Sequence, residues 1–298
     1  FQDRFRNLSY PGLKENEIDF LAKVPKMMRS MLSNELEKIL PNLSNESRNK
    51  LIDVAVCDTR FTPTLNFNEI FSYVKNDFTK VKDLQIIMEK IMNSLLENSI
   101  KFGLNNSFHL HLMPNLGVKD GKEIIKYATK DEFGTTDIQF IIKGAIKEAG
   151  LLFLLNKYIS KKTGIFPFGE KFNVRNAPKT IKELIKLCRD KIPNNQMPLL
   201  VGVGDTVTSV KDDKANSWLR GGSDRGFLTL IQSLGESYKK ENQVIFVNSS
   251  NDQVLRPRIN WPDMKGISDP YDDLKFNMVI NDGPEEYLDW FKQLSSNF

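Results

Sequence analysis

The chain has 298 residues, of which 40% are hydrophobic, and a formal net charge of +4 at pH 7. A chain of this length can bury a substantial core, and we expect two domains rather than one. Basic residues are scattered among nearly as many acidic ones, which argues against nucleic acid as a partner. The longest apolar run, about residues 150–155, is far shorter than the roughly 20 residues of a membrane span, so we expect a soluble protein.

The first half of the chain has the pattern of an α+β domain. Residues 14–103 show mostly helical spacing and include one apolar stripe that we interpret as core packing. The stripe consists of Leu84, Ile87, Ile91 and Leu95. We expect strands at residues 108–112 and 138–142, separated by a polar turn at 115–121 and a short helix at 122–127.

From residue 143 onward, helices and strands alternate, which predicts a parallel sheet. The expected helices are residues 145–159, with an end at Gly164, residues 180–189 and 223–234, and a last helix that begins at Gly283-Pro284. The expected strands are residues 199–204, 244–248 and 276–280.

The apolar run at 199–203 ends abruptly in Gly204-Asp205. A run without alternation is typical of a strand buried on both faces, and open α/β sheets bind ligands at the carboxyl ends of such strands. Asp224 precedes another helical apolar run, and two carboxylates at one sheet edge suit Mg²⁺, which prefers oxygen ligands. Thr206 and Ser223 stand beside these acids as supporting residues. Asp224 or Ser223 could instead cap the following helix.

Lys147 lies at the start of a helix, directly after the strand expected at 138–142. Its ammonium group could enter the same cleft as Asp205 and neutralise a phosphate. The alternative is a solvated surface lysine. The order of strand, lysine-bearing helix, strand and paired acids indicates the second half of a phosphotransferase site.

Cys57 and Cys188 belong to no zinc or redox motif, so we expect two reduced structural thiols. No signal peptide is visible, and the cytoplasm is the expected location. The chain begins at Phe1 rather than at a methionine, which suggests a fragment, a processed chain or an incomplete chain.

The order of these motifs resembles that of the haloacid dehalogenase-like phosphatase superfamily. Within it, the chain is similar nearly from end to end to the glucosylglycerol-phosphate phosphatases. The strings that carry this resemblance are Asn-Ser-Phe at 106–108, His111, Pro-Asn-Leu-Gly at 114–117, Gly-Lys-Glu-Ile-Ile at 121–125, Gly-Thr-Thr-Asp at 134–137, Lys-Glu-Ala-Gly at 147–150, residues 202–209 and Gly-Gly-Ser-Asp-Arg at 221–225.

The resemblance implies an α/β fold in which a haloacid dehalogenase-like Rossmannoid core carries an inserted α+β cap domain. Residues 1–136 would form the cap, which selects the substrate, and residues 137–298 the C-terminal part of the catalytic core. The implied activity is Mg²⁺-dependent hydrolysis of a small-molecule sugar phosphate, glucosylglycerol 3-phosphate, in compatible-solute synthesis and salt tolerance. A phosphatase for sucrose, trehalose or mannosylglycerate phosphate is the nearest alternative, and a non-catalytic sugar-phosphate binding protein is another.

In this family, Lys147 matches the lysine that stabilises the phosphoryl group, and Asp205 matches an acid that holds Mg²⁺. Asp224 is our choice for the second metal-binding acid. Related enzymes place that acid only a few residues after the first, whereas here residues 210–220 intervene and suggest an inserted loop or hairpin.

Hydrogen-bonding residues of the cap are expected to bind the polyol of the substrate. They are His111, Asn115, Thr135, Thr136 and Asp137. A structural histidine on an alternating strand is an equal interpretation of His111, and residues 134–137 could form a plain turn.

The nucleophile is where the chain departs from the family pattern. These phosphatases attack phosphorus with the first aspartate of a D-x-D-G sequence, and no D-x-D occurs among the 298 residues. The chain also offers no convincing candidate for the Ser or Thr of the second family motif. We expect an absent N-terminal segment of roughly a hundred residues to carry both motifs, with a degenerate phosphatase as the alternative. The chain alone is then expected to be inactive.

Overall fold

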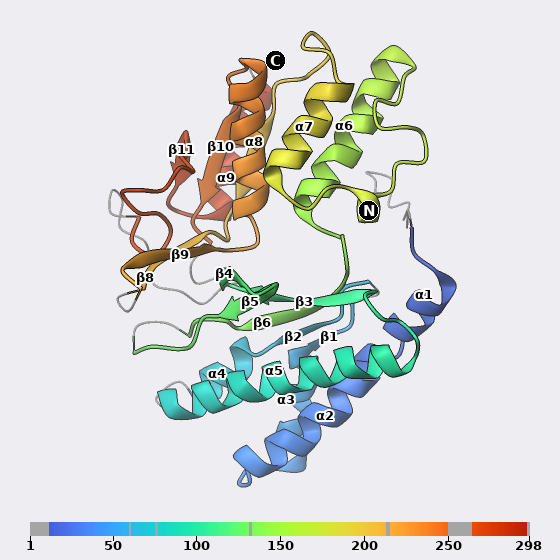
Figure 1. The fold of residues 1–298 in the computed structure, drawn as a ribbon. Coiled ribbons are helices and arrows are strands. Elements are labelled where there is room, and N and C mark those ends of the chain that lie inside the picture. The colour runs from blue at the N-terminus through green and yellow to red at the C-terminus, as the bar shows by residue number, and fades with distance from the viewer. Residues whose placement is uncertain are drawn as a thin grey trace.

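The computed structural model describes residues 12–59, 61–74, 77–130, 133–212, 215–249 and 264–296. Helices and sheets form two units, one above the other in Figure 1, and each has its own hydrophobic core. The buried residues of the first core run from Phe20 to Ile142, and those of the second from Ala149 to Leu274. The expected mixed α/β architecture is therefore confirmed.

The first unit is a four-stranded antiparallel sheet with helices on one side (Figure 1). The strand order is β1-β2-β6-β3. The strands are β1 (Val56–Cys57), β2 (Thr64–Asn66), β3 (Phe108–Met113) and β6 (Asp137–Ile142). The helices are α1 (Glu15–Leu21), α2 (Val24–Ile39), α3 (Asn45–Ala55), α4 (Asn68–Tyr73) and α5 (Phe78–Lys101). The apolar stripe of α5 packs in this core, as its spacing predicts.

Strand β6 corrects the expected domain boundary. We placed the division at 136/137, but residues 137–142 pair with β2 and with β3. Side chains such as Ile138 and Phe140 belong to the first hydrophobic core. The boundary between the two units therefore lies in the connection 143–146, because backbone pairing across two strands ties β6 to the first sheet.

Residues 115–125 form a β-hairpin and not the expected turn and short helix. Strand β4 (Asn115–Lys119) pairs with β5 (Lys122–Ile125), and Lys119 lies opposite Lys122. The two loop residues, Asp120 and Gly121, both have positive φ. Asp-Gly is the sequence that a tight two-residue hairpin turn favours, and this signal outweighs the helical interpretation of the residues that follow.

The second unit contains a parallel sheet in the order β11-β10-β7, as the alternation of helices and strands predicts. Its strands are β7 (Val201–Gly204), β10 (Gln243–Val247) and β11 (Met278–Ile280). A hairpin of β8 (Thr208–Asp212) and β9 (Ser217–Gly221) fills the interval where we expected an inserted loop or hairpin. The helices are α6 (Lys147–Thr163), η1 (Val174–Asn176), α7 (Ile181–Lys191), α8 (Arg225–Tyr238) and α9 (Pro284–Ser296).

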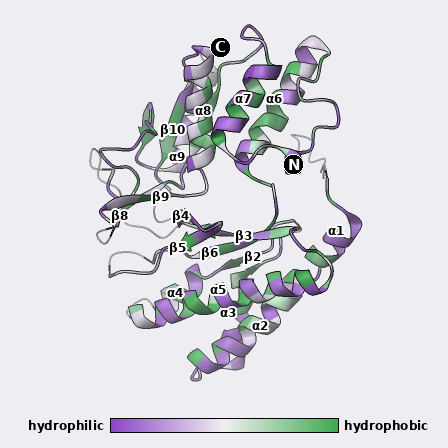
Figure 2. Cartoon of the chain, in the orientation of Figure 1, coloured by the Kyte–Doolittle hydropathy of each residue, from purple (hydrophilic) through white to green (hydrophobic). Residues whose placement is uncertain are grey.

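The burial of a strand in this sheet follows its position, as the central strand and one edge strand show. The central strand β10 is almost wholly buried and is coloured as hydrophobic in Figure 2. Strand β7 lies at the sheet edge within the described part of the chain, and Leu199 and Val201 are 59% and 49% exposed. The expected burial of this run on both faces is therefore wrong at its beginning, although Gly202 and Gly204 are buried.

Both cysteines are free, as expected. Helix α6 ends at Gly164, which adopts the left-handed conformation that glycine favours. Among the residues that the structure describes, none of the helices combines the length and hydropathy that a membrane span requires.

Candidate active site

A cavity of about 390 Å³ lies between the two units. The second unit contributes residues at the start of α6, at the carboxyl end of β7 and in the turn before α8: Lys147, Asp205, Thr206 and Ser223. Side chains of β2 and β6 line it from the first unit. The cavity therefore brings together the lysine and one acid that the sequence singled out, although they are 58 positions apart (205 − 147) in the chain.

The buried side chain of Asp224 forms hydrogen bonds to Lys147 and to the residues that follow β7. One of its carboxylate oxygens accepts a hydrogen bond from Lys147 Nζ, and the other accepts bonds from the backbone N–H groups of Asp205 and Thr206, each at 3.0 Å. The Asp224 side chain is 5% exposed, whereas that of Lys147 is 54% exposed. Asp224 thus holds both the lysine and the turn that presents Asp205.

The bonding of Asp224 does not match the expected capping role. It stands at the N-cap position of α8, but its side chain makes no capping hydrogen bond to that helix. One oxygen is bonded to Lys147 and the other to two backbone N–H groups, and a metal-binding role of Asp224 stays a prediction. Gly204 makes the arrangement possible, because a Cβ there would lie 2.7 Å from Asp224 Cβ.

Asp205 has the environment of a metal ligand. Its Oδ1 accepts a hydrogen bond from Thr206 Oγ1 at 2.9 Å, and its Oδ2 accepts one from Ser249 Oγ at 2.6 Å. Mg²⁺ is commonly bound by one or two carboxylates together with water and substrate phosphate. Asp205 therefore fits Mg²⁺, although the described residues contain no group of three or more His, Cys, Asp or Glu that could enclose an ion.

Ser249 is a site residue that the sequence analysis missed. It follows strand β10, whose carboxyl end lies beside that of β7 because the two strands are parallel neighbours. The available signal was a polar Asn248-Ser249 pair at the end of an apolar run, which is the same pattern that identified Asp205.

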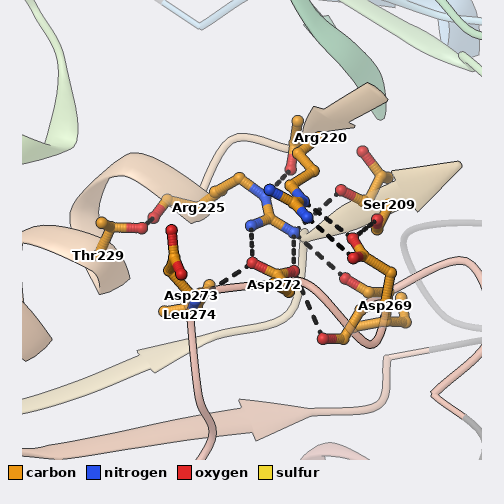
Figure 3. Close-up of polar contacts among 12 residues, drawn as sticks. Ser209, Arg220, Arg225, Thr229, Asp269, Asp272, Asp273 and Leu274 are labelled. Carbon is orange, nitrogen blue, oxygen red and sulfur yellow. Dashed lines mark hydrogen bonds and ion pairs between the residues drawn. The ribbon is translucent and has the colours of Figure 1, made fainter. Parts of the chain in front are cut away.

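Segment 264–274 holds the start of α8 in place, as Figure 3 shows. Arg225 donates two hydrogen bonds of 2.8 Å to the carboxylate of Asp272, and Arg220 donates two of 2.8 Å to Asp269. Hydrogen bonds from Arg220 hold the pKa of Asp269 well below its usual range. Because Arg225 directly follows Asp224, these two-bond arginine–carboxylate pairs fix the position of the Asp224 carboxylate.

Of the five residues expected to bind substrate, Asp137 lines the cavity. Thr135 is buried, donates a hydrogen bond to Pro114 O at 2.6 Å and accepts one from Lys126 N at 2.9 Å. Thr136 is also buried and donates to Asp137 Oδ2 at 2.9 Å. The two threonines therefore shape the backbone that carries Asp137.

Asn115 and His111 have structural partners. The Asn115 side-chain oxygen accepts hydrogen bonds from Gly117 N and Gly222 N, each at 3.0 Å, and its amide nitrogen donates to Leu112 O and to Glu123. These contacts join the β4–β5 hairpin to the turn before α8 and leave the amide saturated. His111 Nδ1 lies 2.7 Å from Glu123 Oε1. A direct substrate contact by Asn115 is therefore not supported.

Burial of Asp137 disfavours the charged form of its carboxyl group. It is 6% exposed, and burial raises its pKa to about 6, although hydrogen bonds from Thr136 and Asn66 partly oppose the rise. A buried carboxyl group with a perturbed pKa, placed in a cavity, is a typical feature of functional sites.

Asp137→Asn is expected to stabilise the folded protein at pH 7. Between pH 4 and 6 the folded state keeps a proton on Asp137 that the unfolded chain releases, so wild-type stability falls as pH rises through this window, by about 3 kcal/mol at most. Asparagine has no such titration. Urea unfolding should therefore show the variant to be more stable by roughly 1–3 kcal/mol at pH 7 and close to wild type at pH 3.5. Asp289→Asn, at an exposed position, is the control; equal stabilities at pH 7 would contradict the expectation.

The chain is similar to known proteins over nearly its whole length. The family model described as glucosylglycerol-phosphate phosphatase matches residues 1–295. A glucosylglycerol-phosphate phosphatase of Synechocystis sp. is 38% identical over 306 aligned positions, which cover 98% of this chain and 72% of that protein. No solved structure matches the chain. Because the family match extends over almost all of its residues, the chain belongs to the glucosylglycerol-phosphate phosphatase family.

Proposed function

We propose that the protein is a phosphoric monoester hydrolase that converts glucosylglycerol 3-phosphate to glucosylglycerol and phosphate. The observation that carries the proposal is the placement of Lys147 and Asp205 in one cavity, where the buried Asp224 bonds to both, in a chain whose residues 1–295 match the phosphatase family. Lys147, together with Mg²⁺ held by Asp205, would bind a phosphate at one end of the cavity, and the polar opposite wall suits a sugar.

We further assign the second unit as a haloacid dehalogenase-like core and the first as its cap. The parallel strand β7 presents Asp205 at its carboxyl end, and Lys147 begins the helix that follows the connection between the units. The antiparallel sheet of the first unit covers the cavity. These features support the assignment.

Lys147 would bind the phosphoryl oxygens and neutralise the negative charge that accumulates during transfer. Asp224 would hold the lysine in place, and Thr206 would orient the carboxylate of Asp205. Asp205 would hold Mg²⁺, which supplies additional charge stabilisation at the phosphoryl group. Ser223 lines the same end of the cavity, where its hydroxyl would bind a phosphate oxygen.

The attacking aspartate of the family does not come from these residues, because the 298 residues contain no D-x-D sequence. The described site then provides substrate binding and charge neutralisation. We expect the isolated 298-residue chain to release no phosphate in the presence of Mg²⁺. Measurable turnover by this purified chain would contradict the assignment of the nucleophile.

The substrate is tested by phosphate release from the full-length protein, with Mg²⁺ and with EDTA. The panel is glucosylglycerol 3-phosphate and the phosphates of sucrose, trehalose and mannosylglycerate. The highest kcat/KM is expected for glucosylglycerol 3-phosphate. A preference for another member would overturn the substrate but keep the reaction class, whereas binding of these esters without turnover by the full-length protein would favour a sugar-phosphate binding protein.

A further inference from the structure

The wall of the cavity opposite Lys147 is built from two rows of side chains across the sheet of the first unit. In one row, Thr64 lies opposite Gln139. In the other, Asn66 lies opposite Asp137, which in turn lies opposite Met113. Residues opposite each other in an antiparallel sheet project from the same face, and all five line the cavity. We call these five residues the polar wall.

The hydrogen bonds within the polar wall leave particular groups open to a ligand. Asn66 holds Asp137 through its side chain and accepts a bond from Asn68 N at 3.0 Å. Thr64 Oγ1 donates to Thr62 O at 2.8 Å. Gln139, by contrast, makes no side-chain hydrogen bond to any residue in the described ranges.

A sugar supplies groups that match these. The Gln139 amide offers two donor hydrogens and an acceptor, the Asp137 carboxylate is an acceptor, and Met113 offers an apolar surface. The hydroxyl groups of a sugar both donate and accept hydrogen bonds, and the C–H faces of its ring are apolar. The Gln139 amide, which has no partner in the described ranges, is therefore the group in the polar wall best able to discriminate among polyols.

The charge of the polar wall limits the ligand further. Asp137 is its only acidic residue, and Lys147, the only cation that lines the cavity among the described residues, is bonded to Asp224 at the phosphate end. A carboxylate on the non-phosphate part of a substrate would meet Asp137 without a compensating cation, and like charges at a binding surface disfavour a ligand.

We propose that the polar wall binds the glucosylglycerol part of the substrate, that Gln139 determines specificity for it, and that Asp137 excludes sugars that carry a carboxylate, such as mannosylglycerate. This proposal rests on the proposed function, since it assigns the non-phosphate end of the same site. It adds residues that touch the sugar rather than the phosphate.

The first test uses Gln139→Leu in the full-length protein, with Gln139→Ala as a second variant. Loss of the amide is expected to lower kcat/KM for glucosylglycerol 3-phosphate by about tenfold or more, while the inhibition constant of inorganic phosphate stays within about twofold of wild type. Gln293→Leu, the same change at an exposed position on α9, is the matched control and should leave both values unchanged. Thermal unfolding of each variant checks the fold.

The second test compares Asp137→Asn with wild type on mannosylglycerate phosphate and glucosylglycerol 3-phosphate. The ratio of the two kcat/KM values is expected to shift toward the acidic sugar by about tenfold. An unchanged ratio would overturn the exclusion by Asp137, and an unchanged kcat/KM in both Gln139 variants would overturn the role of Gln139. Absence of wild-type turnover of glucosylglycerol 3-phosphate would instead contradict the proposed function, and the variants would then be measured on the ester that is hydrolysed.

Discussion

Lys147→Ala is expected to lower kcat of the full-length protein by about 100- to 1000-fold, the usual cost of removing one preorganised charge or donor at a reacting centre. Its ammonium group is the cation that lines the cavity among the described residues, at the end where we propose that the phosphate binds, and Asp224 holds it there. The fold should persist, because the lysine side chain is half exposed and Asp224 keeps its two backbone donors. Steady-state phosphate release, with circular dichroism to verify folding, measures both effects.

Two further variants separate charge from geometry. Lys161→Ala removes an exposed lysine from the last turn of the same helix and should leave kcat unchanged. Lys147→Arg keeps the charge but changes its shape, and an intermediate loss is expected. Near-normal turnover by Lys147→Ala would rule out the assigned role of this lysine.

Arg175→Ala is expected to lower the free energy of unfolding by about 3–5 kcal/mol, because it leaves a buried carboxylate without its counter-charge. Glu17, on helix α1, is completely buried and accepts hydrogen bonds of 2.7 and 2.9 Å from Arg175 in η1. The pair joins the first unit to the second. Urea unfolding at pH 7 measures the loss, and Arg29→Ala, which breaks an exposed pair with Asp53, should cost less than about 1 kcal/mol.

The effect of Arg175→Ala should also depend on pH. Burial by itself would raise the pKa of Glu17, but hydrogen bonds from Arg175 and Lys14 more than offset this, and the pKa is lowered. The stability that this ionised carboxylate contributes is therefore present above its unfolded pKa of about 4.5 and is lost as pH falls. The difference between wild type and variant should narrow below pH 4, and a constant difference would contradict an electrostatic origin.

The residues at the end of the cavity that holds Lys147 could be found by sequence analysis, because each of them follows or begins a regular element. Asp205 ends an apolar run, and Lys147 starts a strongly apolar helix, so their positions depend on local periodicity that the sequence displays. The parallel sheet followed from the alternation of helices and strands for the same reason.

Other features depend on contacts between distant segments. The assignment of β6 to the first sheet results from pairing with β2 and β3, which lie far from it in the chain. Asn115 was expected to bind substrate, and its saturation by Gly117 and Gly222 becomes visible only when two loops meet. Residue type alone does not reveal whether an amide is already satisfied.

The choice of Asp205 and Lys147, the alternation of helices and strands after residue 143 and the family resemblance were thus determined by the sequence itself, because local hydrophobic period and short motifs encode them. Only the tertiary structure decided that Asp224 bonds to Lys147 and to the backbone of residues 205–206, and that Gln139 faces the same cavity. The physical reason is that side-chain bonding and strand register depend on which distant groups the folded chain brings within hydrogen-bonding distance.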